Sequence, residues 1–266
     1  MEQISSRQNT LVKRLRALAH DRGAEGEVLL DGVHLIEEAL ASGVELRLVL
    51  VAGDAMDDAP GALAARAAAR GARTIMISRS VAEAISPVRT PTGIIAVATL
   101  RACSLDSLLQ RTPQLLVMLD HVQDPGNLGA VVRTAEGCGA TGLITGAGTA
   151  DPFGWKALRG SMGSAFRVPI AGVESLAEAI TSVKRAGVHV FATVPRGGTP
   201  LHEATLTGPS AFVLGGEGAG LPKAILDAAD AGITIPMRGR VESLNVSVAA
   251  ALVLYEALRQ RQHVPL

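Results

Sequence analysis

The sequence predicts an α/β protein with two domains. Short apolar runs typical of strands alternate with helical periodicities along most of the 266 residues. The alternation stops at residues 101–113, where polar residues and Pro113 indicate a linker. We therefore expect one domain at 1–100 and a second at 114–266, and an apolar content of 48% is enough to give both a buried core.

Charge and cysteine content limit the possible partners. The chain has 25 basic and 25 acidic residues, so any site for a polyanion must be local. Cys103 and Cys138 fit neither a disulfide framework nor a metal knuckle, which indicates a reducing compartment and, by default, the cytoplasm. The start of the chain lacks the apolar core of a signal peptide, and the run 246–255 is too short to span a bilayer. We expect a soluble protein without a membrane partner.

The first 22 residues predict a basic amphipathic helix. Leucines at 11, 15 and 18 recur at helical spacing, and five basic residues outnumber two acidic ones. The five are Arg7, Lys13, Arg14, Arg16 and Arg22. The basic face is either an ordinary solvated surface or a contact for phosphate groups.

Residues 27–100 predict a small α/β domain. Strands are expected at 28–32, 45–53, 73–78 and 93–100, and helices at 33–43, 61–71 and 80–85. The loop SPVRTPTG at 86–93 carries Arg89 and is either a connector or a surface facing the substrate. The first 152 residues contain no Phe, Trp or Tyr, so this half is not a module that stacks bases on aromatic rings.

The second half predicts a mainly parallel sheet covered on both faces. Strands are expected at 115–120, 142–145, 167–170, 188–194, 211–216 and 233–236. Helices are expected at 128–138, 155–162, 174–186 and 221–229, with a closing helix after Asn245. Ligands of such sheets bind at the carboxyl ends of the strands.

The first of three sequence blocks, HVQDPGNLGAVVRTAEGCGA, begins at His121, directly after a strand. Pro125 to Asn127 can open a helix with Asn127 as its cap, and the free amides there favour an anion. Arg133 lies about one and two-thirds turns further on. By spacing alone, this block is more typical of a well-capped helix with an exposed arginine.

The second block, LGGEGAGLP, covers residues 214–222. Its glycines permit backbone turns and let a ligand approach the main chain. The block is not a GxxxxGK[ST] phosphate loop, because Lys223 follows a proline and precedes Ala224. It is not a GxGxxG dinucleotide fingerprint either, because Lys223 stands where the last glycine would follow Gly218 and Gly220. It is either a ligand loop of another kind or a tight turn.

The third block, IPMRGRVESLNVSVAAALVLYEAL, begins at Ile235. Ser243 or Asn245 can cap the apolar helix that follows, which is typical of core or of a dimer interface. The residues at its mouth, together with Arg238 and Arg240, are better candidates for chemistry. No HxxxH, HExxH or GxSxG pattern occurs, so neither a metal site nor a nucleophile elbow is expected.

In this order, the three blocks resemble the three motifs of the SpoU (TrmH-type) ribose 2'-O-methyltransferases of the SPOUT class. The match consists of Asn127 with Arg133, then GGEGAGL, then IPM followed by SLNVSVA, over about 150 residues. The segment KALRGSMGSAFRVPI at 156–170 is also similar to the family. The first domain, with LLDGVHLIEEAL and SPVRTPTGI, resembles a substrate-binding domain similar to ribosomal protein L30e.

The resemblance implies a fold that periodicity alone does not predict. Knots are nearly absent from proteins, yet this family threads its C-terminal segment into a deep trefoil knot, here roughly between 212 and 258. The knot holds S-adenosylmethionine in a bent shape. The resemblance also implies a homodimer through the C-terminal domain, with an active site that uses residues of both subunits.

The resemblance also assigns roles to single residues. The implied catalytic set is Arg133, Asn127, Glu217, Ser243 and Asn245. The implied cofactor-binding set is Leu214, Gly215, Gly216, Gly218, Ile235, Met237 and Leu244. The implied contacts to RNA are Arg159, Arg167, Arg89 and Arg14. An arginine is almost always protonated, so Arg133 is either a base, as the family suggests, or a group that orients the hydroxyl and stabilises its developing negative charge.

The sequence thus predicts an enzyme that transfers a methyl group from S-adenosylmethionine to a ribose 2'-hydroxyl, in 23S rRNA, without a metal. Two alternatives remain open at this point: a tRNA ribose 2'-O-methyltransferase, and a module that binds RNA or nucleotides without catalysis.

Overall fold

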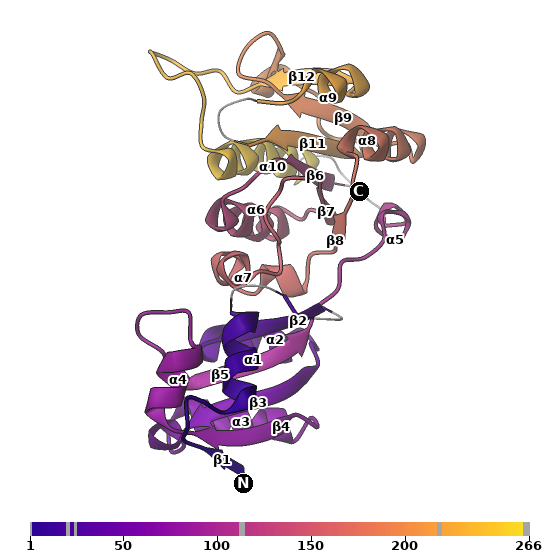
Figure 1. Ribbon diagram of the computed structural model, residues 1–266. Coiled ribbons are helices and arrows are strands. Elements are labelled where there is room, and N and C mark those ends of the chain that lie inside the picture. Colours follow the sequence, from indigo (N-terminus) through magenta and orange to yellow (C-terminus); the bar gives the residue numbers. More distant parts are fainter. Residues whose placement is uncertain (1, 20–21, 24–25, 112–114, 217–219, 263–266) are drawn as a thin grey trace. The chain divides into compact units, whose positions relative to one another are not determined.

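The computed structural model describes residues 2–19, 22–23, 26–111, 115–216 and 220–262 (Figure 1). The chain forms two compact units. The first contains Met1–Arg101 and Phe153–Phe166, and the second contains Ala102–Pro152 and Arg167–Leu266. A short segment from the second half of the sequence therefore belongs to the first unit.

The first unit is built on a mixed sheet. In the described residues its strands lie in the order β1, β4, β3, β5, β2. Their bounds are β1 (Glu2–Ile4), β2 (Glu27–Asp31), β3 (Leu46–Ala52), β4 (Arg73–Ile77) and β5 (Ile94–Thr99). Strand β5 runs antiparallel to both β2 and β3, whereas β4 pairs in parallel with β1 and β3. The alternation of strands and helices predicted for residues 27–100 is confirmed.

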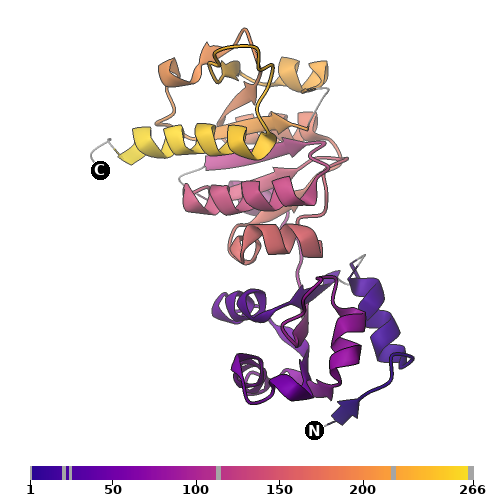
Figure 2. The same cartoon turned by 90° about the vertical axis from the view of Figure 1, so that its left-hand side faces the viewer.

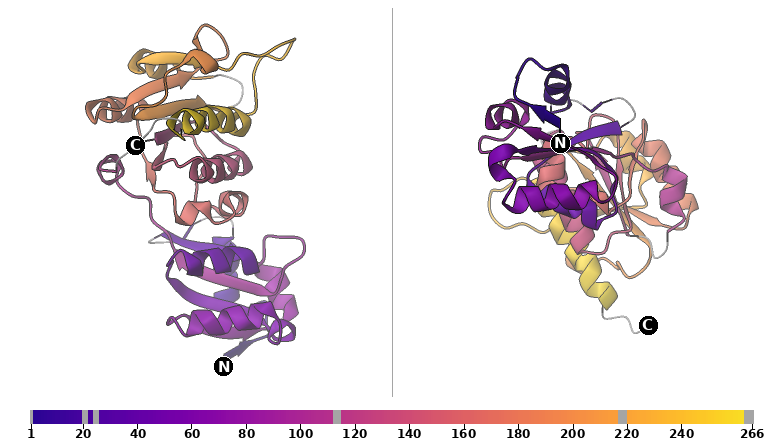
Figure 3. Two further views of the ribbon diagram at one scale, coloured as in Figure 1. Left: turned by 180° about the vertical axis from the view of Figure 1, so that it is seen from behind. Right: turned by 90° about the horizontal axis from the view of Figure 1, so that it is seen from below.

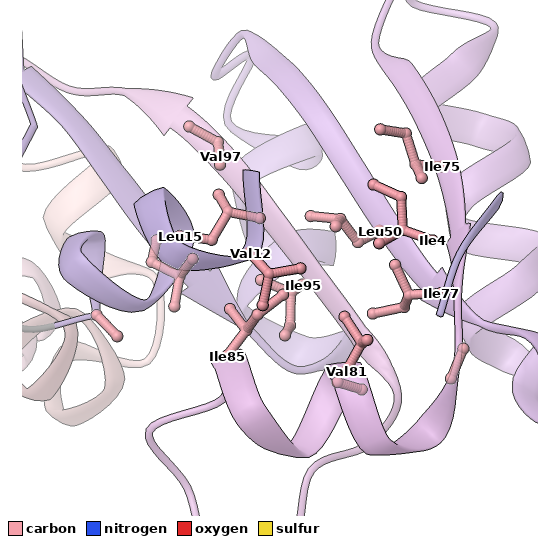
Figure 4. Packing of buried hydrophobic residues seen from close by; sticks show 14 of the residues in the cluster. Ile4, Val12, Leu15, Leu50, Ile75, Ile77, Val81, Ile85, Ile95 and Val97 are labelled. Atoms are coloured by element: carbon pink, nitrogen blue, oxygen red, sulfur yellow. The ribbon is translucent and has the colours of Figure 1, made fainter. Parts of the chain in front are cut away.

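Helices cover both faces of this sheet (Figure 2). They are α1 (Thr10–Leu18), α2 (Val33–Ala41), α3 (Ala59–Ala68) and α4 (Arg79–Ile85), and α7 (Trp155–Ser161) packs near β2. Helices α1 and α4 share one face, where Leu15 and Ile85 meet Leu50 and Ile95 of the sheet (Figure 4). Each of these four side chains is at most 2% exposed, so this layer is a closed apolar core.

The prediction of one helix over residues 1–22 is wrong for its first part. Residues 2–4 form the edge strand β1, which pairs with β4. The helix begins only at Thr10, because the side chain of Asn9 accepts a hydrogen bond from the amide of Leu11 and caps it. The predicted apolar stripe is confirmed at Leu15 and Leu18, which are buried.

The second unit is built on a parallel sheet, as predicted. Its described strands lie in the order β10, β12, β9, β11, β6, β7, β8, and each of their pairings is parallel. The bounds are β6 (Leu115–Asp120), β7 (Gly142–Thr145), β8 (Ile170–Gly172), β9 (His189–Thr193), β10 (Thr199–Pro200), β11 (Ser210–Gly215) and β12 (Ala231–Thr234).

The helices of this unit cover both faces of its sheet (Figures 1 and 3). On one face α5 (Leu105–Leu109), α8 (Leu176–Arg185) and α9 (Lys223–Ala228) enclose an apolar core with the strands. On the other, α6 (Pro125–Gly137) and α10 (Val246–Gln262) lie side by side. Within the described ranges, no helix has the length and apolar character needed to cross a membrane.

Candidate active site

The site is built where strands of the second unit end. Strand β11 pairs with β6 until Gly215 faces Asp120, and it also pairs with β9. The loops that leave β6, β9, β11 and β12 therefore emerge at one edge of the sheet. This is the edge at which parallel sheets bind ligands.

The first block begins its helix one turn earlier than the sequence predicted. Asp124, not Asn127, is the cap of α6, and its carboxylate accepts a 2.8 Å hydrogen bond from the amide of Asn127. Pro125 occupies the first helical turn, which its fixed backbone suits. Asn127 therefore lies inside the helix, and its side chain is available for other contacts.

Asn127 connects the first block to the third. Its Oδ1 accepts a hydrogen bond of 3.1 Å from Nδ2 of Asn245, a residue 118 positions later. Oδ1 of Asn245 in turn accepts bonds from the amide and hydroxyl of Ser247, at 2.9 and 2.6 Å. Asn245 thus satisfies an amide at the start of α10, as expected for a cap, while it fixes the position of Asn127.

A cavity of about 570 Å³ lies at this edge. We call it the first cavity. It is enclosed by the ends of β9, β11 and β12, by the loop that follows β12, and by the start of α10. Its lining residues are Thr193, Val194, Pro195, Leu214, Gly215, Gly216, Gly220, Leu221, Ile233, Ile235, Met237, Glu242, Ser243, Leu244, Asn245, Val246 and Ala249.

The first cavity collects most residues of the predicted cofactor-binding set. Six members line it: Leu214, Gly215, Gly216, Ile235, Met237 and Leu244. The seventh, Gly218, lies outside the described residues, as does the catalytic candidate Glu217. Ser243 and Asn245 of the catalytic set also line the cavity. The roles of these residues remain predictions, but the structure brings the second and third blocks together.

Gly216 is required by a close approach of two chain segments. Its amide donates a 2.8 Å hydrogen bond to the carbonyl of Asp120. A Cβ atom at Gly216 would lie 2.0 Å from the carbonyl oxygen of His121, far inside contact distance. The second block therefore has a physical reason for glycine at this position, which a tight turn alone would not supply.

A second cavity, of about 500 Å³, adjoins the first. The two share Gly216, Gly220 and Val246 in their walls. The remaining lining residues of the second cavity are Asp120, His121, Val122, Gln123, Asp124, Asn127 and Pro222. The hydrogen bond between Asn127 and Asn245 therefore joins a residue of one cavity to a residue of the other.

Arg133 lines neither cavity. It is exposed on α6, the helix that packs beside α10, and among the described residues its side chain has no hydrogen-bond or ion-pair partner. Within one chain, the structure therefore does not bring Arg133 together with Ser243 or Asn245. Its assignment as a catalytic residue stays a prediction.

The four arginines predicted to contact RNA are all exposed, and two of them are ion-paired. Arg14 donates to Glu27 at 2.6 Å, and Arg167 donates to Glu136 at 3.0 Å. Arg89 lies in the loop after α4, and Arg159 lies on α7 in the first unit. In the described part of the chain, no cluster of His, Cys, Asp and Glu is arranged to hold a metal ion.

Sequence reasoning missed several residues of the cavity walls. Thr193 to Pro195 line the first cavity because β9 ends there, and His121 lines the second because β6 ends there. The signal for them was available, since ligands gather at the carboxyl ends of parallel strands. Motif spacing could not reveal Thr193 to Pro195, because they lie outside the three blocks, and it gave no role to His121, the first residue of the first block.

Comparison with known proteins matches two parts of the chain to two family models. Residues 114–255 match the model of the SpoU rRNA Methylase family. Residues 9–96 match the MRM3-like substrate binding domain. The chain is 35% identical over 257 residues to the 23S rRNA (guanosine(2553)-2'-O)-methyltransferase RlmP of Bacillus subtilis, covering 96% of this chain and 98% of that protein.

Solved structures extend the likeness over almost the whole chain. An AdoMet-bound rRNA methyltransferase from Sinorhizobium meliloti superposes with a TM-score of 0.87 at 30% identity and covers 99% of both chains. The SpoU methyltransferase AviRb from Streptomyces viridochromogenes, in complex with AdoMet, superposes with a TM-score of 0.84 at 31% identity and covers 97% of this chain and 100% of that one. The ordered motifs, the parallel sheet and these matches together show that the chain belongs to the SpoU rRNA Methylase family.

Proposed function

We propose that the protein is an S-adenosylmethionine-dependent methyltransferase that methylates a ribose 2'-hydroxyl of RNA, and that its substrate is 23S rRNA. The observation that carries the proposal is the hydrogen bond between Asn127 and Asn245, which links two adjoining cavities at the carboxyl edge of the sheet. A transfer between two bound molecules needs two such sites side by side.

The first cavity suits the cofactor. Its volume is typical of small-molecule sites, and side chains such as Leu214, Ile235 and Leu244 supply apolar walls. None of its described lining residues is Lys or Arg. Among these residues, Glu242 is the only one with an ionisable side chain. This composition favours a ligand with positive charge, such as a sulfonium with an amino group, over a nucleotide that carries several phosphates.

When bound, S-adenosylmethionine supplies an activated methyl group on a sulfonium sulfur. The chain's own residues must hold the ribose hydroxyl in line and ease the loss of its proton. In the proposal, Asn127 and Asn245 position the hydroxyl, and Ser243 shapes the wall beside it. Arg133, with Glu217, orients the oxygen and stabilises its developing negative charge.

Because Arg133 lines neither cavity of its own chain, we infer that it acts in a homodimer. Val248, Leu252 and Tyr255 recur at helical spacing on α10, and their exposed fractions are 47%, 42% and 64%. This apolar stripe lies on the helix beside α6, which carries Arg133. A second copy seated on the stripe would bring its own Arg133 close to these cavities.

The remaining parts of the proposal follow from family membership. The segment between 212 and 258 forms the trefoil knot around the cofactor. The first unit selects the RNA, and Arg14, Arg89, Arg159 and Arg167 contact its phosphates. Two of these arginines, Arg14 and Arg167, must then exchange a carboxylate partner for phosphate. The protein acts in the cytoplasm, where ribosomal RNA is processed.

The test is transfer of a labelled methyl group from S-adenosylmethionine to RNA. The purified protein should label a 23S rRNA transcript at a ribose 2'-oxygen and leave tRNA unlabelled. Labelling of tRNA alone would show that the protein is a tRNA ribose 2'-O-methyltransferase. Binding of RNA without any labelling would show that it binds RNA without catalysis.

The role of Arg133 is tested in the same assay. Arg133→Ala should abolish transfer while the affinity for S-adenosylmethionine, measured by calorimetry, stays near the wild-type value. Retained turnover in this variant would contradict the assignment.

A further inference from the structure

His121 lies at the end of β6 with an unusual backbone conformation. Its φ is 53°, in the left-handed region that residues other than glycine rarely adopt. The preceding carbonyl accepts the amide of Gly216, and the carbonyl of His121 itself lies against Gly216. The strain is therefore held in place by the loop that lines both cavities, and strained residues of this kind cluster at functional sites.

The imidazole is oriented by a buried carboxylate. Nδ1 of His121 lies 3.1 Å from Oδ2 of Asp120, whose side chain is 8% exposed, while the His121 side chain is 58% exposed. A carboxylate held in this way fixes the ring's position and leaves Nε2 and the ring surface for another partner. The ring is anchored at one end and accessible over most of its surface.

One side of the ring is covered by glycine. A Cβ atom at Gly148 would lie 2.5 Å from Cδ2, 2.9 Å from Nε2 and 3.1 Å from Cγ of His121. These three distances are nearly equal, as they are for an atom above the ring's face and not for one beyond its edge. The backbone of Gly148 therefore lies over one face of the imidazole. Because the side chain is 58% exposed, a flat partner would approach the ring from the opposite face.

His121 also lines the second cavity, which adjoins the first. It is the only residue with a ring system of aromatic character among the described lining residues of that cavity. Proteins that bind single-stranded RNA commonly stack splayed-out bases on such rings, histidine included. Among the described lining residues, His121 alone offers an aromatic ring for that contact.

We propose that the second cavity receives the acceptor nucleoside and that the face of His121 opposite Gly148 stacks on its nucleobase. The inference rests on the proposed function, because the acceptor ribose must lie beside the first cavity to receive the methyl group. The stacked base fixes the rotation of the nucleoside, so that its 2'-hydroxyl is presented toward Asn127 and Asn245. His121 is thus a substrate-positioning residue and takes no part in proton transfer.

The first experiment compares His121→Ala with His121→Phe in the full-length protein, using the 23S rRNA transcript as substrate. Loss of a stacking surface should raise KM for the transcript by about tenfold or more in the alanine variant. The phenylalanine variant keeps a flat ring and should stay within about threefold of wild type. Affinity for S-adenosylmethionine should be unchanged in both, which also shows that the variants are folded.

The second experiment displaces the ring without changing it. In Gly148→Ala, the new Cβ would push the imidazole from its place, so KM for the transcript should rise as in His121→Ala. In the double variant, which combines Gly148→Ala with His121→Ala, KM for the transcript should equal that of His121→Ala alone. Gly139→Ala is the matched control, because Gly139 has a φ of 75°, close to the 74° of Gly148, and open space where its Cβ would lie. It should leave KM unchanged.

Two results would overturn the inference while leaving the proposed function intact. One is that the wild-type protein methylates the transcript and that His121→Ala has the same KM for it. The other is equal impairment of the alanine and phenylalanine variants. Failure of the wild-type protein to label RNA would instead remove the proposed function and the inference with it, so the two failures are distinguishable.

Discussion

At the scale of single residues, the site depends on a few polar and small side chains. Asn245 bonds to Asn127 through its nitrogen and caps α10 through its oxygen. Gly216 lets the loop after β11 lie directly on His121. Each of these residues has a local and a long-range role, so substitutions can separate the two.

Asn245 offers one such separation. Asn245→Ser keeps a side-chain oxygen that can cap α10 but loses the bond to Asn127, whereas Asn245→Ala loses both. We expect the serine variant to melt close to wild type and the alanine variant to lose about 1 kcal/mol of unfolding free energy. Methyl transfer should fall by about tenfold or more in both variants. Wild-type activity in the serine variant would show that the bond to Asn127 is not needed.

Gly216 offers a second test. Gly216→Ala places a Cβ where 2.0 Å would separate it from the His121 carbonyl oxygen, so the loop must move. We expect affinity for S-adenosylmethionine to fall about tenfold or more, measured by calorimetry. The control is Gly137→Ala in α6, where a Cβ meets nothing within 4 Å. Equal affinities in the two variants would contradict this account.

At the scale of elements, α10 has two different faces. One packs beside α6 and β11 through residues such as Val253 and Leu254, which are fully buried. The other presents Val248, Leu252 and Tyr255 to solvent. An exposed apolar stripe of this kind is typical of a contact with another molecule, which is the dimer partner in the proposal.

The proposed dimer is tested on this stripe. Leu252→Asp should convert the protein from dimer to monomer in sedimentation or light-scattering measurements, because it buries a charge in the expected interface. Methyl transfer should be lost with the dimer, while the monomer keeps its fold by circular dichroism. Leu226→Asp on α9 is the control, because Leu226 has a similar exposure of 40% against 42% for Leu252. A monomeric wild-type protein would contradict the proposal.

The end of α10 predicts a pH dependence of stability. The carboxylate of Glu256 accepts hydrogen bonds from Arg259 and Gln260, and these bonds lower the pKa of Glu256 from 4.5 to about 2. A lowered folded-state pKa stabilises the fold above about pH 4.5, and the contribution is lost as the pH falls through 2.

Glu256→Gln is therefore expected to unfold more easily than wild type at pH 7, by about 1 kcal/mol, because the ion pair is partly exposed. The difference should shrink between pH 4.5 and 2, measured by urea denaturation at several pH values. Arg259→Gln should show the same trend. A constant difference over this range would mean that the carboxylate charge contributes nothing.

At the scale of the whole molecule, sequence order and spatial grouping differ. Residues 153–166 follow the start of the methyltransferase motifs, yet they belong to the first unit, where α7 packs near β2. The described residues that line the two cavities all belong to the second unit. The described cavity walls and the first unit therefore share no residue, although the segment with α7 lies between parts of the second unit in the sequence.

Deletion of residues 1–101 should accordingly separate two functions. We expect the shortened protein to bind S-adenosylmethionine with near wild-type affinity, because the first cavity is intact. Methylation of the 23S rRNA transcript should fall strongly, because RNA selection is the role proposed for the first unit. The melting temperature should fall as well, since α7 loses β2 as its neighbour. Unchanged activity on the transcript would contradict the division of roles.

The amino-acid sequence by itself determined the elements and the family. Apolar periodicity predicted the parallel sheet from residue 115 onward, and the ordered motifs indicated a SpoU methyltransferase, which the comparisons confirm. These features are local or depend only on order along the chain. The glycines at 215 and 216 were visible in the sequence, but the close contact that requires glycine at 216 was not, because it involves a distant part of the chain.

Only the tertiary structure decided which distant residues meet. It moved the cap of α6 to Asp124, joined Asn127 to Asn245 across 118 positions, and placed His121 beside the second cavity. It also assigned 153–166 to the first unit. The physical reason is that strand order in the sheet, not distance along the chain, determines which loops share an edge. Contacts between those loops leave no periodic signal in the sequence.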